Sequence, residues 1–205
     1  MSSTNRGGKR ANNDFYPTPA WCVHRLLEAC PLPGGAWLEP AAGDGAIILA
    51  VNKVRRVKWW ANEPDRSRPR PLGVRQCNIT HEDFLRIPTA NINADVIITN
   101  PPFALAQEFV EHALQATYWH KKPKWPEMGE RDHAVIVMLL RLNFLGGGKR
   151  GELLRQDTPS VYVLPNRPSF TPDGKTDSCD YAWFVWGLGD GARLTILNDT
   201  PKGER

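Results

Sequence analysis

Apolar residues in this chain fall into short runs that alternate between two spacings. Continuous runs rich in Val, Ile, Trp and Phe are typical of strands buried in a sheet. Such strands are predicted at residues 36–39, 57–62, 74–77, 96–99, 134–140, 161–164, 181–186 and 193–197. Elsewhere apolar residues recur every three or four positions, which is typical of helices that pack on one face. These helices are predicted at residues 19–30, 46–52, 103–117 and 152–155.

The alternation of strands and helices predicts an α/β fold, with a mainly parallel sheet covered by helices on both faces. The strands at 161–164 and 181–186 flank one polar loop, so we expect them to form an antiparallel pair that makes the sheet mixed. Thr18 is predicted to cap the first helix, with Pro19 in its first turn. Ligands of such sheets bind beyond the carboxyl ends of the strands, so residues directly after strands are candidates for chemistry.

The chain has 205 residues, which suits one domain with a sizeable core. Residues 1–13 are polar, basic and rich in Gly, Ser and Asn, which predicts a disordered leader before a single domain at 14–205. No apolar run is long enough to cross a bilayer. The four cysteines form no C-x-x-C pair, and the five histidines show no metal or triad spacing. We therefore expect a reduced, cytoplasmic protein without a metal site.

The turn after the strand at 36–39 combines an acid with glycines. Glu39 ends the strand, and Pro40, Ala41, Gly43 and Gly45 follow it. Glycines between a strand and a helix allow a tight turn and a close approach of the backbone to a ligand. A carboxylate here repels a pyrophosphate but attracts an ammonium group, which favours an amino-acid-like cation over a dinucleotide. A purely structural turn is the alternative.

Two further acids follow the next strands. Glu63 lies twenty positions after Gly43 (63 − 43), where an acid commonly accepts hydrogen bonds from ribose hydroxyls. Asp83 lies another twenty positions on (83 − 63) and is suited to accept from the exocyclic amine of a base. The ring of Phe84 is suited to stack on that base. Solvated acids at strand ends are the alternative for both positions.

The strand at 96–99 runs directly into Asn100, Pro101, Pro102 and Phe103. The prolines cannot continue a ladder of hydrogen bonds, and they stiffen the backbone after the strand. The side-chain oxygen of Asn100 and the carbonyl of Pro101 are then available as two fixed acceptors for the hydrogens of an aromatic amine. Such acceptors favour a pyramidal nitrogen with a localised lone pair, and Phe103 is suited to stack on the ring that carries it. A strand-ending turn without chemistry is the alternative.

In this order, these motifs resemble the class I S-adenosylmethionine-dependent methyltransferases, and specifically the gamma-type N6-adenine DNA methyltransferases. Matches to the family occur at 16–19, 39–45, Glu63, 83–84, 100–103, 142–145 and 167–186. Residues 142–145 and 167–186 resemble the later strands of small phage-type members. The resemblance covers residues 14–186 and implies a Rossmann-like sheet of seven strands. It also implies S-adenosylmethionine as cofactor, with Tyr16, Thr18, Pro19 and Asn100 beside it, in a bacterial or phage-infected cell.

The chain departs from many family members in two ways. It has Asn and Phe where many DNA enzymes have Asp-Pro-Pro-Tyr, and Phe at this position also occurs in RNA methyltransferases. The chain also has no room for a separate target recognition domain. The resemblance therefore leaves the recognition of a particular sequence open.

The formal net charge of +4 gives a mild lean toward polyanionic partners, and the expected partner is DNA, with RNA as the alternative. Residues 118–125 interleave aromatics with positive charge, as in proteins that hold splayed strands; Trp119, Lys121, Lys122 and Lys124 are the candidates there. The loop 165–180 offers Arg167, Phe170 and Lys175. Arginines within 66–75 form a third candidate track. Ordinary solvated loops are the alternative for each segment.

Four functions fit these residues. The first is N6-adenine methylation of DNA with the target base flipped out, because N6 is paired inside a duplex. The second is methylation of an adenine or guanine amino group in RNA. The third is methylation of a glutamine amide in a protein, although such enzymes usually carry Tyr after the prolines. The fourth is a catalytically silent scaffold that binds nucleic acid. The oligomeric state is not predicted.

Overall fold

The computed structural model describes residues 16–68, 74, 77–119, 134–171, 173–189 and 191–205. The predicted leader at 1–13 and the candidates Lys121, Lys122 and Lys124 lie outside the described residues. Within the described part of the chain, no helix is both long and apolar enough to span a membrane.

The described strands form one mixed sheet in the order β3-β2-β1-β4-β5-β7-β6-β8. Their bounds are β1 Ala36–Glu39, β2 Lys58–Asn62, β3 Cys77–Thr80, β4 Val96–Thr99, β5 Val135–Arg141, β6 Ser160–Val163, β7 Tyr181–Trp186 and β8 Leu194–Ile196. β7 runs antiparallel to both β5 and β6, and every other pair is parallel. The α/β class and the antiparallel pair are confirmed. The sheet has eight strands rather than the seven that the resemblance implies, and the strand predicted at 193–197 is present as β8, a short edge strand beside β6.

The third predicted strand was placed wrongly. It was expected at 74–77, but β3 covers Cys77–Thr80. β3 lies at the edge of the sheet and none of its residues is buried, so no apolar run marks its position. Its register is set instead by parallel pairing with β2, which aligns Trp60 with Asn78.

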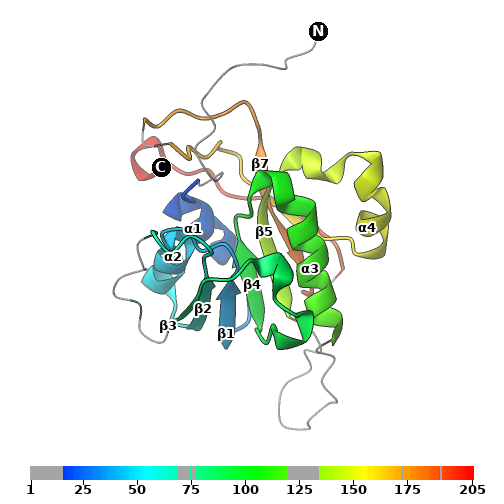
Figure 1. Ribbon diagram of the computed structural model, residues 1–205. Helices are drawn as coiled ribbons and strands as arrows, with labels where there is room; N and C mark the ends of the chain where they lie inside the picture. Colours follow the sequence, from blue (N-terminus) through cyan, green and yellow to red (C-terminus); the bar gives the residue numbers. More distant parts are fainter. Residues whose placement is uncertain (1–15, 69–73, 75–76, 120–133, 172, 190) are drawn as a thin grey trace.

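The main helices are α1 Ala20–Ala29, α2 Ala46–Val54, α3 Ala106–Trp119 and α4 Gly151–Gln156. Figure 1 shows α1 and α2 together on one side of the sheet, and α3 with α4 on the other. Successive residues of β5 alternate between the two layers: Val135, Val137 and Leu139 join the cluster of α1 and α2, and the intervening residues join the cluster of α3. All of these side chains are buried, as expected for a strand covered on both faces.

The topology creates one natural crevice. From β1 the chain builds outward through β2 to β3, and it then returns to form β4 on the other side of β1. The order of strands reverses between β1 and β4, so the turns after these two strands lead away from each other. A ligand site is expected at this point.

Candidate active site

A cavity of about 480 Å³ lies at this reversal point. It is lined by residues that follow β1, β2 and β4, by the segment before α1, and by residues around Asp83. Of the predicted site residues it is lined by Tyr16, Thr18, Glu39, Pro40, Ala41, Gly43, Glu63, Asp83, Phe84, Asn100 and Pro102. One cavity therefore collects residues that the sequence spreads over positions 16–102.

The remaining predicted residues lie nearby but have other positions. Pro19 is the residue that precedes helix α1, and Gly45 precedes helix α2 in the left-handed conformation, with a φ of 82°. Pro101 is buried. Phe103 does not line this cavity and is described below.

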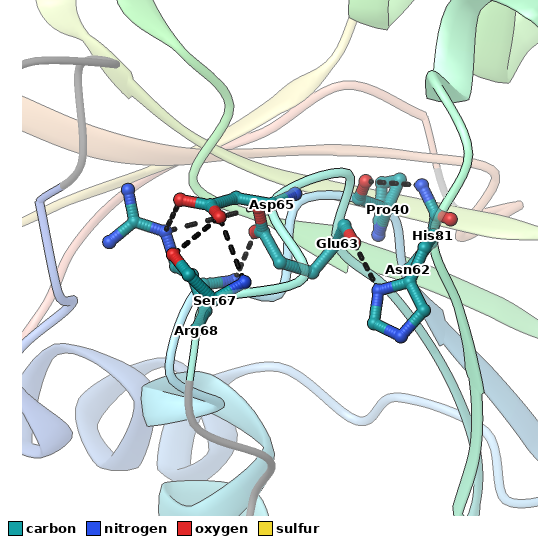
Figure 2. Close-up of polar contacts among 8 residues, drawn as sticks. Pro40, Asn62, Glu63, Asp65, Ser67, Arg68 and His81 are labelled. Atoms are coloured by element: carbon teal, nitrogen blue, oxygen red, sulfur yellow. Dashed lines mark hydrogen bonds and ion pairs between the residues drawn. The ribbon is translucent and has the colours of Figure 1, made fainter.

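Glu63 ties the glycine turn to the loop after β2. One of its carboxylate oxygens accepts from the backbone N–H of Gly43 at 2.8 Å, and the other accepts from that of Asp65 at 2.9 Å. Figure 2 shows Arg68 and Ser67 gathered around Asp65 on the same loop. Each carboxylate oxygen has two lone pairs, so Glu63 can still accept from a ligand while it holds the loop.

Asn62 is a clamp that the sequence did not reveal. Its side chain is fully buried and donates to the carbonyls of Pro40 and Glu82, at 3.2 and 2.9 Å. Its oxygen accepts from the Thr80 hydroxyl and the Glu82 N–H. One amide therefore fixes the turns after β1 and β3 against the end of β2. Figure 2 shows its contact with Pro40. A buried amide at the last position of a strand is the signal that would have pointed to it.

Glu39 is a buried acid without a full set of partners. Its side chain is 2% exposed, and its Oε2 atom has no hydrogen-bond partner among the described residues. Burial raises the pKa of this carboxyl well above its ordinary value, and the negative charge of Asp44 raises it further. An orphaned buried carboxylate oxygen on a cavity wall is costly unless a donor or a cation completes it.

Asn100 has a fixed orientation in the cavity wall. Its Nδ2 atom donates to the carbonyl of Tyr16 and to the hydroxyl of Thr18, each at 3.2 Å. The reverse orientation would place two carbonyl oxygens against each other, so these contacts determine which way the amide points. The Oδ1 atom is buried and has no partner among the described residues. It is thus an acceptor held in place and left available.

The same contacts correct the prediction for Thr18. The helix α1 begins at Ala20 with Pro19 at the capping position, and no side chain caps it. The hydroxyl of Thr18 accepts from Asn100 instead, and the side chain is buried. A local capping rule could not foresee this competitor, which lies 82 residues away along the chain.

Asp83 and Phe84 reach the cavity in different ways. The side chain of Asp83 accepts from the N–H of Leu85 at 3.1 Å and pairs with Arg86 at 3.5 Å. The ring of Phe84 is 1% exposed and packs against Phe109 and His112 with centroid separations of 5.0 and 4.9 Å. Phe84 therefore forms part of the wall, and it lacks the open ring face that stacking on a base requires.

Phe103 lies in a cluster of four aromatic rings from distant parts of the chain, which we call the aromatic cluster: Tyr16, Phe103, Phe170 and Tyr181. Tyr16 stacks on Phe103 at 5.6 Å and 23°, and Phe170 meets Phe103 edge-on at 6.2 Å. The loop after β6 thus reaches the carboxyl end of β4, as predicted. The guanidinium of Arg141 also lies over the ring of Phe103, at 4.5 Å from its centroid.

The other predicted nucleic-acid residues are more peripheral. Arg167 pairs with Asp180 at 2.7 Å, and Lys175 pairs with Asp173 at 3.0 Å, on exposed parts of the loop. Trp119 is the last residue of α3, and its side chain lies outside the described part of the structure. Within the third candidate track, Arg68 lines the cavity and lies 3.9 Å from Glu63, so it does not form an outward phosphate track.

The sequence pattern did not single out Tyr181, a member of the aromatic cluster, or Arg141, which lies over the Phe103 ring. Tyr181 is fully buried, and its hydroxyl donates to Asp177 at 2.7 Å. Arg141 ends β5 and donates from Nε to the Tyr181 oxygen at 3.4 Å. Ligand sites lie beyond the carboxyl ends of strands in such sheets, and Arg141 lies at that end of β5. The same rule would therefore have pointed to Arg141.

The fold is similar to that of solved structures whose names describe a modification subunit and a candidate methyltransferase. A modification subunit of a candidate type I restriction enzyme from Vibrio vulnificus YJ016 matches with a TM-score of 0.63 and 18% identity, over 92% of this chain and 48% of that chain. A candidate RNA methyltransferase from Pyrococcus horikoshii matches with a TM-score of 0.57 and 12% identity, over 90% of this chain and 93% of that one. This chain therefore spans about half the length of the first protein. No protein-family model and no curated protein matches the sequence.

At these identities the matches concern the fold. With the observed order of strands, they show the Rossmann-like class I methyltransferase fold that the resemblance implies.

Proposed function

We propose that this chain is an S-adenosylmethionine-dependent methyltransferase that acts on the exocyclic N6 of adenine in DNA, with the target base flipped out of the duplex. The observation that carries the proposal is the Oδ1 atom of Asn100, which is buried, fixed in orientation and without a partner among the described residues. A fixed acceptor in a cavity wall suits an amino group that must be held and polarised.

The residues of the cavity fit the cofactor. The orphaned carboxylate oxygen of Glu39 suits the ammonium group of the methionine part, which would supply the missing donor and favour the charged carboxylate. Glu63 keeps lone pairs for the ribose hydroxyls. Asp83, which is half-exposed, suits the amine of the cofactor's adenine. A cavity of about 480 Å³ lies within the range of cofactor sites.

The chain's own contribution is to position the amino group that receives the methyl group. Asn100 Oδ1 and the carbonyl of Pro101 hold the two hydrogens of the amino group, and the prolines keep these acceptors rigid. The bound cofactor would supply an electrophilic methyl group, so that an N–C bond forms as the S–C bond breaks and the surplus proton leaves to solvent. No strong general base is needed, which agrees with the choice of an amide rather than a carboxylate at position 100.

The aromatic cluster supports a planar acceptor. Phe103, which directly follows Pro102, and Phe170 lie edge to face. Aromatic rings are the usual substitutes for the stacking that a flipped base loses. A glutamine side chain would need no such surface, which makes the protein-methylating alternative weaker.

RNA is the second candidate substrate. The matched structures include a protein named as a candidate RNA methyltransferase, and the aromatic residue at position 103 is Phe. The contacts around Asn100 would serve an amino group on either polymer.

One assay separates these functions. Purified protein with S-adenosylmethionine labelled in its methyl group is offered DNA, RNA and protein fractions, and the labelled product is digested and identified. We expect label in DNA, as N6-methyladenine. Label in RNA alone would reject the DNA proposal, and label in protein glutamine would reject both nucleic acids. Nucleic-acid binding without any label would identify a scaffold.

A further inference from the structure

A second cavity adjoins residues 100–103, which we call the catalytic segment, and it shares no lining residue with the first cavity. It has a volume of about 330 Å³ and lies between the start of α3, the end of β5 and the 3-10 turn Leu142–Leu145. Its polar and charged walls come from Gln107, Glu108, Arg141, Asn143 and Arg150. Phe103 lines this second cavity, while its neighbours Asn100 and Pro102 line the first. The catalytic segment is therefore the partition between two cavities.

Two arginines line the second cavity, and they are not equivalent. Arg150 donates to the carbonyls of Phe144, Asn143 and Gly146, and it lies over the Phe144 ring. These contacts hold the turn after β5 and commit most of the guanidinium. Arg141 makes fewer and longer contacts: Nε donates to Tyr181 at 3.4 Å, and Nη2 pairs with Asp177 at 3.5 Å. None of the described residues accepts from its Nη1.

The ion pair between Arg141 and Asp177 can open at low cost. Both side chains are more than a third exposed, and such pairs contribute little to stability. Asp177 also keeps other partners, because it accepts from the Tyr181 hydroxyl at 2.7 Å and from the Cys179 N–H at 2.9 Å. Opening this ion pair therefore leaves Asp177 with two other donors.

Arg141 can hold an aromatic ring and an anion at once. Its guanidinium lies 4.5 Å from the centroid of Phe103, and a planar guanidinium that stacks on a ring still presents N–H groups at its edge. Those N–H groups match the oxygens of a phosphodiester. The stacking contact keeps them next to the ring that the proposed function assigns to the acceptor base.

We propose that Arg141 binds the backbone phosphate next to the methylated nucleotide, and that the second cavity receives that part of the acceptor strand. This inference rests on the proposed function and adds a substrate-positioning residue to it. Arg141 would then set the depth to which the flipped base enters, because the phosphate contact and the Phe103 contact belong to one side chain. The chemistry is shared by DNA and RNA strands.

The test is the salt dependence of binding in three variants. Wild type, Arg141→Gln and Arg141→Lys are titrated with a fluorescent oligonucleotide of the polymer that accepts the methyl group, over a range of salt concentrations. Arg56→Gln is the matched control, since Arg56 is exposed and precedes β2, at the opposite end of the sheet. Cofactor affinity measured by calorimetry reports on folding of every variant.

We expect Arg141→Gln to lower the slope of log K against log salt by about one, as for the loss of one phosphate contact, and to raise KM roughly tenfold. Arg141→Lys should keep the slope and lose rate, because it retains the charge and loses the planar stack. The control should match wild type. An unchanged slope in Arg141→Gln would overturn the inference and leave Arg141 as a brace for Phe103. Absence of nucleic-acid binding by wild type would instead reject the proposed function.

Discussion

The two halves of the candidate site are built in different ways. The cofactor half consists of turns after β1, β2 and β3, and backbone groups are joined there by Glu63 and Asn62 through bonds of 2.8–3.2 Å. The proposed acceptor half is the aromatic cluster, in which rings from positions 16, 103, 170 and 181 touch through side chains alone. The first half is fixed by hydrogen bonds between neighbouring strand ends. The second depends on long-range packing and can be altered ring by ring.

Asn100 and Tyr16 join these halves. The carbonyl of Tyr16 accepts from Asn100, and the ring of Tyr16 stacks on Phe103. If the two halves act separately, variants in one should leave binding in the other unchanged. The following predictions test that separation, beginning with the largest expected effect.

Asn100→Ala removes Oδ1, the hydrogen-bond acceptor that lies between the two halves. We expect kcat to fall about 10²- to 10³-fold, as when one preorganised hydrogen-bonding group is lost from an active site. Affinity for the cofactor should stay within about twofold, because its other partners remain. Rates by methyl-transfer assay and affinities by calorimetry check both parts. Asn100→Asp keeps an acceptor oxygen and should retain more rate than Ala; full activity of Asn100→Ala would remove Asn100 from the mechanism.

Glu39→Gln tests the cofactor half alone. We expect affinity for S-adenosylmethionine to fall by roughly 2 kcal/mol, about 30-fold, because the ammonium group loses a buried charged partner. The nucleic-acid affinity should not change. Glu28→Gln on α1 is the control, since that carboxylate lies on the surface beside Arg25. Equal cofactor affinity in Glu39→Gln and wild type would contradict the proposed role.

Glu39 also gives a dependence on pH. Burial raises its pKa above the ordinary value of 4.5, so the free protein holds this proton more tightly than the unfolded chain does. The free energy of unfolding of the free protein should therefore decrease as pH rises from 4.5 through the raised pKa. Cofactor affinity should increase over the same window, because the ammonium group needs the ionised carboxylate. Thermal melts and titrations of Glu39→Gln should lose both trends.

Phe170→Leu tests the acceptor half alone. We expect KM for the nucleic acid to rise about fivefold, because an aromatic stacking surface is lost. This change corresponds to roughly 1 kcal/mol of binding free energy. Cofactor affinity should be unchanged, since Phe170 lies outside the cofactor cavity. A similar loss of cofactor affinity would show that the halves are coupled through Tyr16, which Phe170 touches at 6.1 Å.

Lys175→Gln should have the smallest effect. Its side chain is 83% exposed and pairs with Asp173 on the surface of the loop. We expect a change of less than about threefold in nucleic-acid affinity, seen only at low salt, because exposed charges act mainly through screened attraction. A much larger effect would indicate that the bound nucleic acid runs over this loop.

The local pattern predicted much of the fold because a buried strand appears in the sequence as a continuous run of apolar residues. β4 and β7 begin and end where their apolar runs do, and both are fully buried. β3 was misplaced because an exposed edge strand carries no such run. The cap expected from Thr18 failed for a different reason, since its hydroxyl found a partner far along the chain.

The sequence by itself determined the strand-end motifs, because glycines, acids and prolines impose their turns and charges wherever the chain places them. It therefore identified Glu39, Glu63 and Asn100 as a set. Only the tertiary structure decided which groups remain unsatisfied and which rings meet. The orphaned oxygens of Glu39 and Asn100, the clamp of Asn62 and the contact of Arg141 with Phe103 arise from packing between strands and loops distant in sequence. Hydrogen-bond satisfaction is a property of the whole fold, so no local pattern could have supplied it.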